Sequence, residues 1–412
     1  MGIIVQKFGG TSVGSTERIR HVAQRVIEEK ERGNDVVVVV SAMGKTTDQL
    51  VSLAKEISTY PNKRELDMLL STGEQVTIAL LTMALHELGY KAVSYTGWQA
   101  GIQTEAVHGN ARITHITTEP ILNALNEGNI VVVAGFQGIT SEGAITTLGR
   151  GGSDTTAVAL AASLSAERCD IYTDVTGVYT SDPRYVKAAR QLKAISYDEM
   201  LELANLGAGV LHPRAVEFAK NYRVPLTVRS SMEQVDGTYI EEVNTMESNL
   251  IVRGVAFEKE ITRITVHGLT NQITSLSSIF TTLANHHINV DIIIQVQTDE
   301  NTTNLSFSVK DEDVRETLAV LNEHQSSLGF EKMEAESGLA KVSIVGSGMI
   351  SNPGVAAKMF DVLAQNGIQI KMVSTSEIKV SVVVDQKEMI RAAEILHEAF
   401  GLDKVEETIA AL

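Results

Sequence analysis

The strongest constraint on the fold of this chain is a run of five consecutive valines, Val36 to Val40. An apolar run without polar alternation is typical of a strand that is buried on both faces, as in a parallel sheet. A second run, Val131 to Ala134, has the same character. The two runs predict central strands of a sheet whose faces are both covered.

Strand and helix patterns alternate through residues 3–230. Further strands are expected at 3–8, 171–173 and 226–229, and helices at 16–32, 47–58, 65–88 and 154–165. Strands separated by helices imply βαβ crossovers, so we expect an α/β helix–sheet–helix sandwich with a mainly parallel sheet over residues 1–240. Ligands bind at the carboxyl ends of the strands in such sheets. Four residues lie at or just past these ends, namely Lys7, Ser41, Gly135 and Thr173.

The pattern changes after the last of these strands. A linker and a first regulatory strand are expected at 241–260, followed by an internal repeat. The copies start at 262–268 and at 340–346, and each shows a strand, a helix, an alternating strand pair and one more helix. This order predicts two ferredoxin-like βαββαβ domains, at 261–339 and 340–412.

Composition argues against several classes of protein. Across 412 residues the formal net charge is −16, which disfavours nucleic acid or an anionic membrane as a partner. No apolar run reaches the ~18 residues that a membrane span needs, and the N-terminus lacks a signal-peptide pattern. The single cysteine, Cys169, excludes an internal disulfide framework. We therefore expect a protein of the reducing cytoplasm.

Two glycine-bearing loops, far apart in the sequence, have the parts to hold anions. The first, Lys7–Ser12, follows the first strand, and the second, Arg150–Asp154, opens an alanine-rich helix. Glycines let backbone N–H groups approach an anion, and a helix N-terminus adds partial positive charge. Each loop also carries a cation, Lys7 or Arg150. Two such loops in one domain favour a kinase of small molecules, which must hold two anionic groups together.

For each of four side chains in or near these loops, a role in a functional site and an ordinary structural role are both consistent with the sequence. Lys7 can stabilise a transferring phosphoryl group, and Arg150 can grip a carboxylate with two hydrogen bonds, although either can be a solvated surface cation. Asp154 can take part in a site while it caps its helix. Glu74, in an apolar helical region, would attract an ammonium group, but a helix cap or an exposed glutamate fits the same pattern.

Other motifs give weaker signals. Gly44–Thr46 ends like a P-loop, but Val39 stands where that motif requires glycine, so we reject the P-loop. In the polar loop 173–184, Tyr179 can pack on a base and Arg184 can pair with phosphates, although a plain turn fits as well. The histidines and the cysteine lack metal-ligand spacing, so any metal is expected to be Mg²⁺ carried by nucleotide phosphates.

Taken together, the motifs resemble those of the aspartokinases. The resemblance rests on 7–12 (KFGGTS), 71–74 (STGE), 149–154 (GRGGSD), the Thr173–Asp174 loop and 374–377 (STSE). The resemblance covers essentially the whole chain, and the chain is similar to the monofunctional bacterial type. It implies the amino acid kinase fold with paired C-terminal ACT domains. It also implies ATP-dependent phosphorylation of the L-aspartate side-chain carboxylate, the first step toward lysine, threonine and methionine.

The resemblance implies a role for each matching position. Lys7 and Asp154 would be catalytic, with Asp154 orienting the lysine. ATP would be bound by Lys7, Phe8, Gly9, Gly10, Ser41, Thr173, Asp174, Tyr179, Thr180, Asp182 and Arg184. Aspartate would be bound by Thr47, Glu74, Arg150, Gly151, Gly152 and Ser153, with Arg150 on its α-carboxylate and Glu74 near its ammonium group. The attacking carboxylate is ionised at pH 7, so positioning and charge neutralisation suffice without a general base.

In this family the ACT pair binds end-product amino acids between subunits, which implies a homo-oligomer with lysine, threonine or both as effector. The matching effector positions are Ser275, Asn289, Val290, Asp291, Gln295, Asn366, Gly367 and Ile368. Asn271 stands where an acidic residue is frequent in relatives, which leaves the choice between lysine and threonine open. Met246 opens the regulatory half, and an internal start there would produce a separate small subunit.

Two alternatives remain open at this point. Another amino acid kinase would act on glutamate, carbamate or a nucleoside monophosphate, but Arg150 with Glu74 favours an amino acid, and the ACT pair favours feedback control. A non-catalytic amino acid sensor would keep a dead kinase domain, and the intact Lys7 and Asp154 argue against it. A sensor would bind lysine or threonine without turning over ATP.

Overall fold

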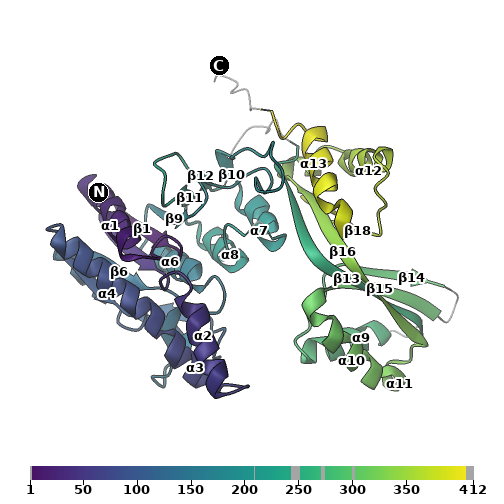
Figure 1. Ribbon diagram of the computed structural model, residues 1–412, viewed down its shortest axis with the longest axis horizontal. Coiled ribbons are helices and arrows are strands. Elements are labelled where there is room, and N and C mark those ends of the chain that lie inside the picture. The colour runs from purple at the N-terminus through teal and green to yellow at the C-terminus, as the bar shows by residue number, and fades with distance from the viewer. Residues whose placement is uncertain (1, 208, 243–250, 271–273, 299–301, 405–412) are drawn as a thin grey trace. The chain divides into compact units, whose positions relative to one another are not determined.

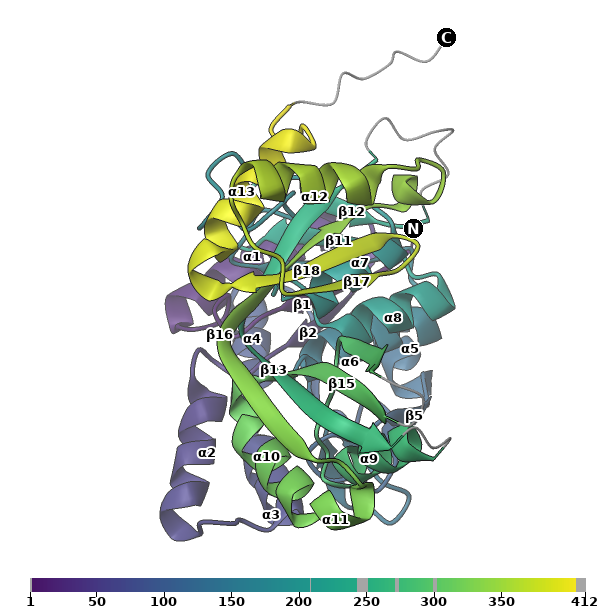
Figure 2. The same cartoon turned by 90° about the vertical axis from the view of Figure 1, so that its right-hand side faces the viewer.

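The computed structural model describes residues 2–207, 209–242, 251–270, 274–298 and 302–404. Its internal contacts divide the chain into two compact units, and many of their helices and strands are labelled in Figure 1 and Figure 2. The first unit comprises Met1–Tyr179, Gln191–Asn205 and Gly209–Met246, and the second comprises Thr180–Arg190, Leu206–Ala208 and Glu247–Leu412.

The first unit is built on an eight-stranded sheet. In spatial order its strands are β10 (Ala194–Ile195), β12 (Thr238–Ile240), β11 (Leu226–Ser230), β9 (Arg168–Thr173), β1 (Ile3–Phe8), β2 (Asp35–Val40), β6 (Ile130–Ala134) and β3 (Ala92–Tyr95). Neighbouring strands are parallel except for β11 with β12. The valines of β2 are completely buried, which confirms the central parallel strand predicted from their sequence.

Helices cover both faces of this sheet (Figure 1). α1 (Thr16–Glu31) and α4 (Thr72–Glu87) pack on one face, where Val22 and Leu81 share a buried core with Val132 of β6. α6 (Gly152–Ser163) packs on the other face against β1 and on α8 (Pro213–Tyr222), which in turn contacts α7 (Tyr197–Asn205). The predicted helix–sheet–helix sandwich is therefore confirmed.

A smaller four-stranded sheet extends the first unit. Its order is β5 (Ile113–Ile116), β4 (Ile102–Thr104), β7 (Gln137–Ile139) and β8 (Ile145–Thr147). The remaining helices of the unit are α2 (Thr46–Ile57), α3 (Lys63–Leu70) and α5 (Glu119–Asn126). Strands of three or four residues are too short to show a reliable periodicity, so the sequence did not predict this sheet. Its last strand, β8, leads directly into the second glycine loop.

The single helix expected at 65–88 is in fact α3 and α4, which are separated at Ser71. The hydroxyl groups of Ser71 and Thr72 donate to backbone carbonyls three residues earlier, at 2.9 and 2.7 Å. By length and composition, Lys63–Glu87 is apolar enough to cross a membrane, contrary to our expectation. Half of its most apolar window is buried, however, and α4 packs on β3 and β6, as a core helix of a globular unit does.

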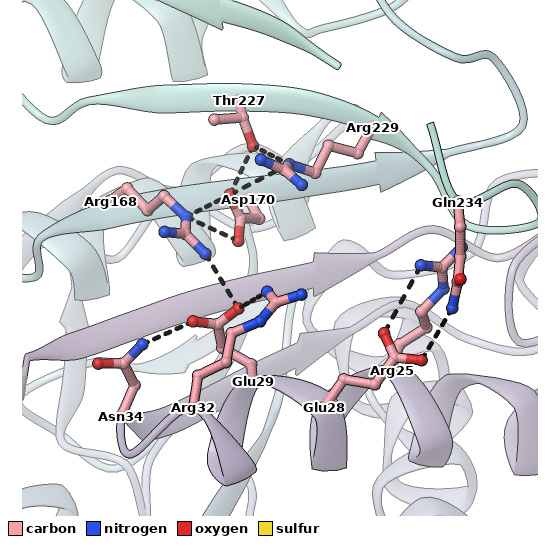
Figure 3. Close-up of polar contacts among 10 residues, drawn as sticks. All are labelled: Arg25, Glu28, Glu29, Arg32, Asn34, Arg168, Asp170, Thr227, Arg229 and Gln234. Atoms are coloured by element: carbon pink, nitrogen blue, oxygen red, sulfur yellow. Dashed lines mark hydrogen bonds and ion pairs between the residues drawn. The ribbon is translucent and has the colours of Figure 1, made fainter. Parts of the chain in front are cut away.

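Buried charges fasten α1 to the sheet (Figure 3). Glu29 of α1 accepts a hydrogen bond from Arg32 at 2.7 Å and another from Arg168 of β9 at 3.0 Å. Arg168 also donates to Asp170 at 2.9 Å, and Asp170 accepts a further bond from Thr227 of β11. Because Glu29 and Asp170 are almost completely buried, Arg168 between them and Arg32 beside Glu29 supply positive charges that these carboxylates need.

The second unit contains one six-stranded antiparallel sheet. Its order is β14 (Ile293–Gln297), β15 (Thr302–Lys310), β13 (Gly254–Thr270), β16 (Lys332–Val345), β18 (Lys379–Asp385) and β17 (Met372–Thr375). Its helical segments are α9 (Ser275–Asn285), η1 (Asp311–Asp313), α10 (Val314–Glu323), α11 (Gln325–Leu328), η2 (Ser347–Ile350), α12 (Val355–Gln365), η3 (Gln386–Glu388) and α13 (Met389–Ala399). The long strands β13 and β16 run through both repeats.

The second repeat departs from the expected βαββαβ order. The described chain has no strand between α13 and residue 404, and the first half of β13 takes the place of the fourth strand. There Gly254 to Glu258 pair with Lys341 to Val345 of β16. Val255 accordingly lies in the same buried core as Val342. The first repeat is thus inserted within the second, while the domain boundaries given above stay predictions.

A short excursion of the chain also belongs to the second unit. Within Thr180–Arg190, Val186 is buried in the core of the second repeat. The carbonyl of Thr180 accepts a hydrogen bond from the backbone N–H of Val255 at 2.8 Å, and Arg190 donates to the carbonyl of Leu402 at 2.9 Å. This excursion contains three of the residues that the resemblance connects with ATP.

Candidate active site

Lys7 and Asp154 form an ion pair at the carboxyl end of β1. The Nζ atom of Lys7 lies 2.6 Å from a carboxylate oxygen of Asp154, and each side chain is 12% exposed. Alternation along β1 points Lys7 away from the core that Phe8 shares with α1 and toward α6, whose first turn contains Asp154. The two glycine loops of the sequence meet here. The ammonium group of Lys7 and the N-terminus of α6 can together hold an anion.

The turn after β1 approaches the segment after β2 too closely for a side chain. A Cβ atom on Gly10 would lie 2.9 Å from the carbonyl oxygen of Ala42 and 3.1 Å from that of Gly44. A Cβ atom on Gly9 would lie 3.4 Å from the Nζ atom of Lys7. Position 10 therefore requires glycine, whereas a Cβ atom at position 9 would only make an ordinary contact with the lysine amine.

Glu74 is buried beneath the same segment. Its side chain stands in the first turn of α4 on a residue that is 2% exposed, and Oε1 accepts a hydrogen bond from the backbone N–H of Ala42 at 3.1 Å. Oε2 is buried and has no hydrogen-bond partner within the described parts of the chain. Burial raises the pKa of Glu74 to about 8, against a smaller lowering by backbone hydrogen bonds. This site can accept a cationic group that pairs with the carboxylate.

Arg150 is the exposed member of the loop between β8 and α6. Gly151, which caps α6, has a φ of +68°, and a Cβ atom there would lie 2.2 Å from the side chain of His212. The N–H of Gly152 donates to the carbonyl of Gly149 at 3.0 Å and closes the loop around Arg150. Glycine is needed at position 151 both for this backbone conformation and for the close approach of His212.

Three other expected residues lie in these segments of the first unit. Ser41 directly follows β2, and its N–H donates to the carbonyl of Phe8 at 3.1 Å. Thr47 is half-buried in the first turn of α2. Ser153 is 8% exposed beside Asp154 in the first turn of α6. The first unit thus supplies the Lys7–Asp154 ion pair, a buried carboxylate oxygen without a hydrogen-bond partner in the described chain, and two tight turns.

Comparison with known proteins identifies the family. Residues 2–230 match the amino acid kinase family, and residues 342–400 match the ACT domain. The aspartokinase of Bacillus sp. (strain MGA3) is 74% identical over 402 residues, which are 98% of each chain. Aspartokinase 2 of Bacillus subtilis (strain 168) is 70% identical over 98% of this chain and 99% of its own.

The chain belongs to the aspartokinase family.

Solved structures agree with this assignment. The structure of E. coli aspartokinase III in complex with aspartate and ADP, described as its R-state, has a TM-score of 0.80 and 29% identity over 96% of this chain and 99% of that one. The same E. coli enzyme in complex with lysine and aspartate, its T-state, has a TM-score of 0.76. The present aspartokinase is accordingly an aspartate kinase that uses a nucleotide, with the amino acid kinase fold and ACT domains.

The loop that is expected to contact nucleotide in this aspartokinase begins in the first unit. The hydroxyl of Thr173 donates to the carboxylate of Asp174 at 3.2 Å, and Asp174 is exposed. The hydroxyl groups of Tyr179 and Thr176 lie 2.7 Å apart. Tyr179 also forms a bridge with Gln191, so the chain leaves and re-enters the first unit at adjacent positions.

The loop continues in the second unit with Thr180, Asp182 and Arg184. Thr180 is fully buried, and its hydroxyl lies 2.8 Å from Nε2 of His397. The guanidinium of Arg184 donates to Asp182 at 2.7 to 3.1 Å. Partial burial acts to raise the pKa of Asp182, but hydrogen bonds and charge from Arg184 lower it overall. The side chain of Arg184 is 80% exposed, whereas Thr180 is buried among its neighbours.

The expected effector positions of the first repeat differ in burial and in the contacts that their side chains make. Ser275, at the start of α9, is buried, and its hydroxyl donates to the carbonyl of Thr270 at 2.7 Å. Asp291 already pairs with the ammonium group of Lys341. The other positions lie between α9 and β14 or on that strand and are exposed or half-buried, namely Asn289, Val290 and Gln295. Asn271 lies outside the described residues, as does Met246.

The effector positions of the second repeat lie where α12 ends. The side-chain amide of Asn366 donates to the carbonyl of Val362 at 2.8 Å. Gly367 follows with a φ of +69°. Ile368 is 4% exposed and belongs to the buried core, so any contact of Ile368 with an effector would be made through its backbone.

Sequence reasoning missed three residues that surround the Arg150 loop of this aspartokinase. His212 lies against Gly151, while Asp67 and Arg214 hydrogen-bond to the segments that precede the loop. Asp67 carried a signal, because it is an acidic residue among the apolar positions of its helix. His212 and Arg214 flank a proline, a pattern that gave no indication of their contacts.

Proposed function

We propose that this aspartokinase transfers the γ-phosphoryl group of ATP to the side-chain carboxylate of L-aspartate in the cytoplasm. The product, 4-phospho-L-aspartate, would open the route to lysine, threonine and methionine. The observation that carries the proposal is the Lys7–Asp154 pair, which joins two glycine loops at the carboxyl end of a central parallel strand. Such an arrangement suits two anions that must react with each other.

The transfer itself needs no general base. An aspartate side-chain oxygen attacks the γ-phosphorus, the bond to the β–γ bridging oxygen breaks, and ADP leaves with that electron pair. Lys7 would neutralise charge on the phosphoryl oxygens, and Asp154 would hold the lysine in place across 2.6 Å. The amides of Gly9 and Gly10 would add hydrogen bonds, because neither residue has a side chain that blocks the approach. In the present structure the Gly9 N–H donates to the carbonyl of Tyr172 at 3.4 Å, so it would have to change or share this partner.

The two charged ends of aspartate would be recognised by residues of opposite sign. Arg150, exposed on its loop, would bind the α-carboxylate, with the loop residues Gly151, Gly152 and Ser153 around it. Glu74 would bind the ammonium group, since its Oε2 lacks a hydrogen-bond partner in the described chain. Thr47 would line the same pocket. An ammonium group beside Glu74 would favour the ionised carboxylate and lower its raised pKa.

ATP would be contacted by Phe8 and Ser41 and by the polar loop that contains Thr173, Asp174, Tyr179, Thr180, Asp182 and Arg184. In the described residues, no group of three or more histidine, cysteine, aspartate and glutamate side chains is arranged to hold a metal ion. We propose that a Mg²⁺ ion is carried mainly by the nucleotide phosphates, where it would supply charge neutralisation.

Feedback control would act through the ACT repeats. We propose lysine, threonine or both as effector, held by Ser275, Asn289, Val290, Asp291 and Gln295 with the turn at Asn366, Gly367 and Ile368. The support is the ACT-domain match and the E. coli relative, which was solved with lysine. Homo-oligomers would form through these repeats, and a start at Met246 would add a small regulatory subunit.

The decisive experiment is aspartate-dependent ATP turnover with the acyl phosphate trapped by hydroxylamine, measured with and without lysine and threonine. Hydroxamate that forms only with aspartate and is suppressed by one of the two amino acids supports both the reaction and its regulation. Turnover that neither amino acid changes refutes the regulation alone. Binding of lysine or threonine without any turnover would refute the proposed reaction in favour of a sensor.

A further inference from the structure

Asp67 makes a dense set of contacts just below the Arg150 loop. Its side chain, on α3, is 1% exposed. Its carboxylate accepts hydrogen bonds from the hydroxyl of Thr147 at 2.6 Å and from the backbone N–H of Gly109 at 3.1 Å, and it lies 2.7 Å from Nδ1 of His108. A buried carboxylate with these partners links the end of β8 to the segment around residue 109.

Arg214 links the same two segments from another helix. From the first turn of α8, it donates to the carbonyl of Leu148 at 2.8 Å and to the carbonyl of Ala111 at 2.7 Å. The N–H of Ala111 donates directly to the carbonyl of Thr147 at 2.9 Å. One acidic and one basic side chain, from α3 and α8, therefore hold residues 147–148 against residues 109–111.

These contacts bracket Arg150 closely in sequence. Leu148, gripped by Arg214, lies two residues before Arg150, and Gly151, packed against His212, directly follows it. Beyond Gly151 the helix α6 begins, with Asp154 paired to Lys7. The backbone on both sides of Arg150 is thus held by α8, which contributes His212 and Arg214 from its N-terminal end.

We infer that Asp67 and Arg214 are positioning residues that fix Arg150 at a set distance from the Lys7–Asp154 pair and so select substrate length. The inference rests on the proposed role of Arg150 as the clamp of the α-carboxylate. If one end of a dicarboxylic amino acid is held by Arg150 and the other reacts beside Lys7, their separation decides which chain length fits. A rigid loop then favours aspartate over glutamate, which is one methylene longer.

A purely structural role would show itself differently. Loss of Arg214 leaves two buried carbonyl groups without a partner, which would lower stability whatever the loop does. A stability role alone would leave the KM for aspartate and the discrimination against glutamate unchanged in the folded fraction. A positioning role changes the kinetics of aspartate and leaves the KM for ATP in place.

The test compares Arg214→Met, Arg214→Lys and Asp67→Asn with wild type, and uses Arg112→Met, an exposed arginine on the neighbouring segment, as the control. The kcat and KM are measured for aspartate, glutamate and ATP, with thermal unfolding alongside. We expect Arg214→Met to raise the KM for aspartate and to reduce the aspartate-to-glutamate preference, each about tenfold, with the KM for ATP within about twofold. Arg214→Lys, which can reach one carbonyl, should lie between Arg214→Met and wild type.

Two results would overturn the inference. The first is a set of folded Arg214 and Asp67 variants with the wild-type aspartate KM and the wild-type preference. The second is a rise of the KM for ATP in these variants that equals the rise of the KM for aspartate. The variant Arg150→Met distinguishes a failure of the positioning role from a failure of the proposed carboxylate-binding role of Arg150. If Arg150→Met leaves the aspartate KM unchanged, the proposed clamp itself fails, whereas a large rise there without an effect at positions 67 and 214 refutes only the positioning role.

Discussion

The backbone N–H of Ala42 donates a hydrogen bond to Oε1 of Glu74 across 3.1 Å, and this bond joins the end of β2 to the first turn of α4. The second carboxylate oxygen is buried without a hydrogen-bond partner in the described chain. A carboxyl group that is satisfied on one oxygen only is costly to ionise in the free enzyme. Glu74 therefore couples proton binding to stability and, in its proposed role, to the binding of the substrate ammonium group.

The free energy of unfolding of the free enzyme should decrease as the pH rises from 4.5 to 8, because of Glu74. Its pKa is about 8 when folded and near the ordinary 4.5 when unfolded, so in this range the folded state holds a proton that the unfolded chain has released. Glu74→Gln should flatten this part of the profile, with a difference of roughly 2–5 kcal/mol between the ends of the range. Urea unfolding from pH 5 to pH 8.5 measures it, and parallel curves for the two proteins would contradict the assignment.

Aspartate binding should release a proton near pH 7. If the substrate ammonium group pairs with Glu74, the bound state favours the ionised carboxylate and the free state the protonated one. Calorimetric titration in buffers with different ionisation heats measures the proton count. We expect close to one proton released by wild type and none by Glu74→Gln, with weaker binding by the variant. An equal proton count in the two proteins would remove Glu74 from ammonium recognition.

Lys7→Ala should lower kcat by orders of magnitude. The substitution removes the cation proposed to neutralise the phosphoryl group and leaves Asp154 without its partner at 2.6 Å. Binding of lysine or threonine, measured by calorimetry, should be retained, because the proposed effector positions belong to the second unit. A kcat near that of wild type would show that Lys7 has no part in the transfer.

Gly10→Ala should be far more damaging than Gly14→Ala. A methyl group on Gly10 would approach a backbone carbonyl to 2.9 Å, whereas on Gly14 its nearest neighbours would be 3.4 Å away. We expect Gly10→Ala to cost about 1–3 kcal/mol and to reduce turnover, because the turn beside Lys7 must shift. Thermal unfolding and steady-state kinetics of the two variants check this, and equal effects would mean that the close packing of the turn is unimportant.

The buried charge network should be the most sensitive part of the sheet. Asp170→Ala leaves Arg168 and Arg229 without the carboxylate between them, and we expect a loss of about 3–5 kcal/mol. Asp35→Ala is the control, because Asp35 is 47% exposed and its pair with Lys30 should contribute only about 0–1 kcal/mol. Denaturant unfolding measures both, and similar values would show that burial does not set the difference.

The parts of this fold that local patterns determine could be predicted from sequence. The valines of β2 can only be covered on both faces, and a cation followed by glycines at the end of a strand marks an anion site. In both cases residues that are adjacent in sequence carry the physical reason. The pairing of Lys7 with Asp154 joins residues that are far apart in sequence, and it was expected from the family resemblance alone.

The missed features depend on residues that are distant in sequence. Asp67 meets Thr147, and Arg214 meets Ala111, through contacts that no local period reports. The burial of Ile368 came from a core whose composition the repeat alone did not reveal. Side chains that support a site through its backbone are hard to find from sequence, because their partners are carbonyl and N–H groups that every residue has.

The insertion of one repeat within the other has a consequence for synthesis. The strand residues Gly254 to Glu258 leave the ribosome long before Lys341 to Val345, with which they pair. Until then the early segment is an unpaired edge that another nascent chain can capture. The order of translation thus leaves this segment of the aspartokinase open to pairing with another copy until Lys341 to Val345 have emerged.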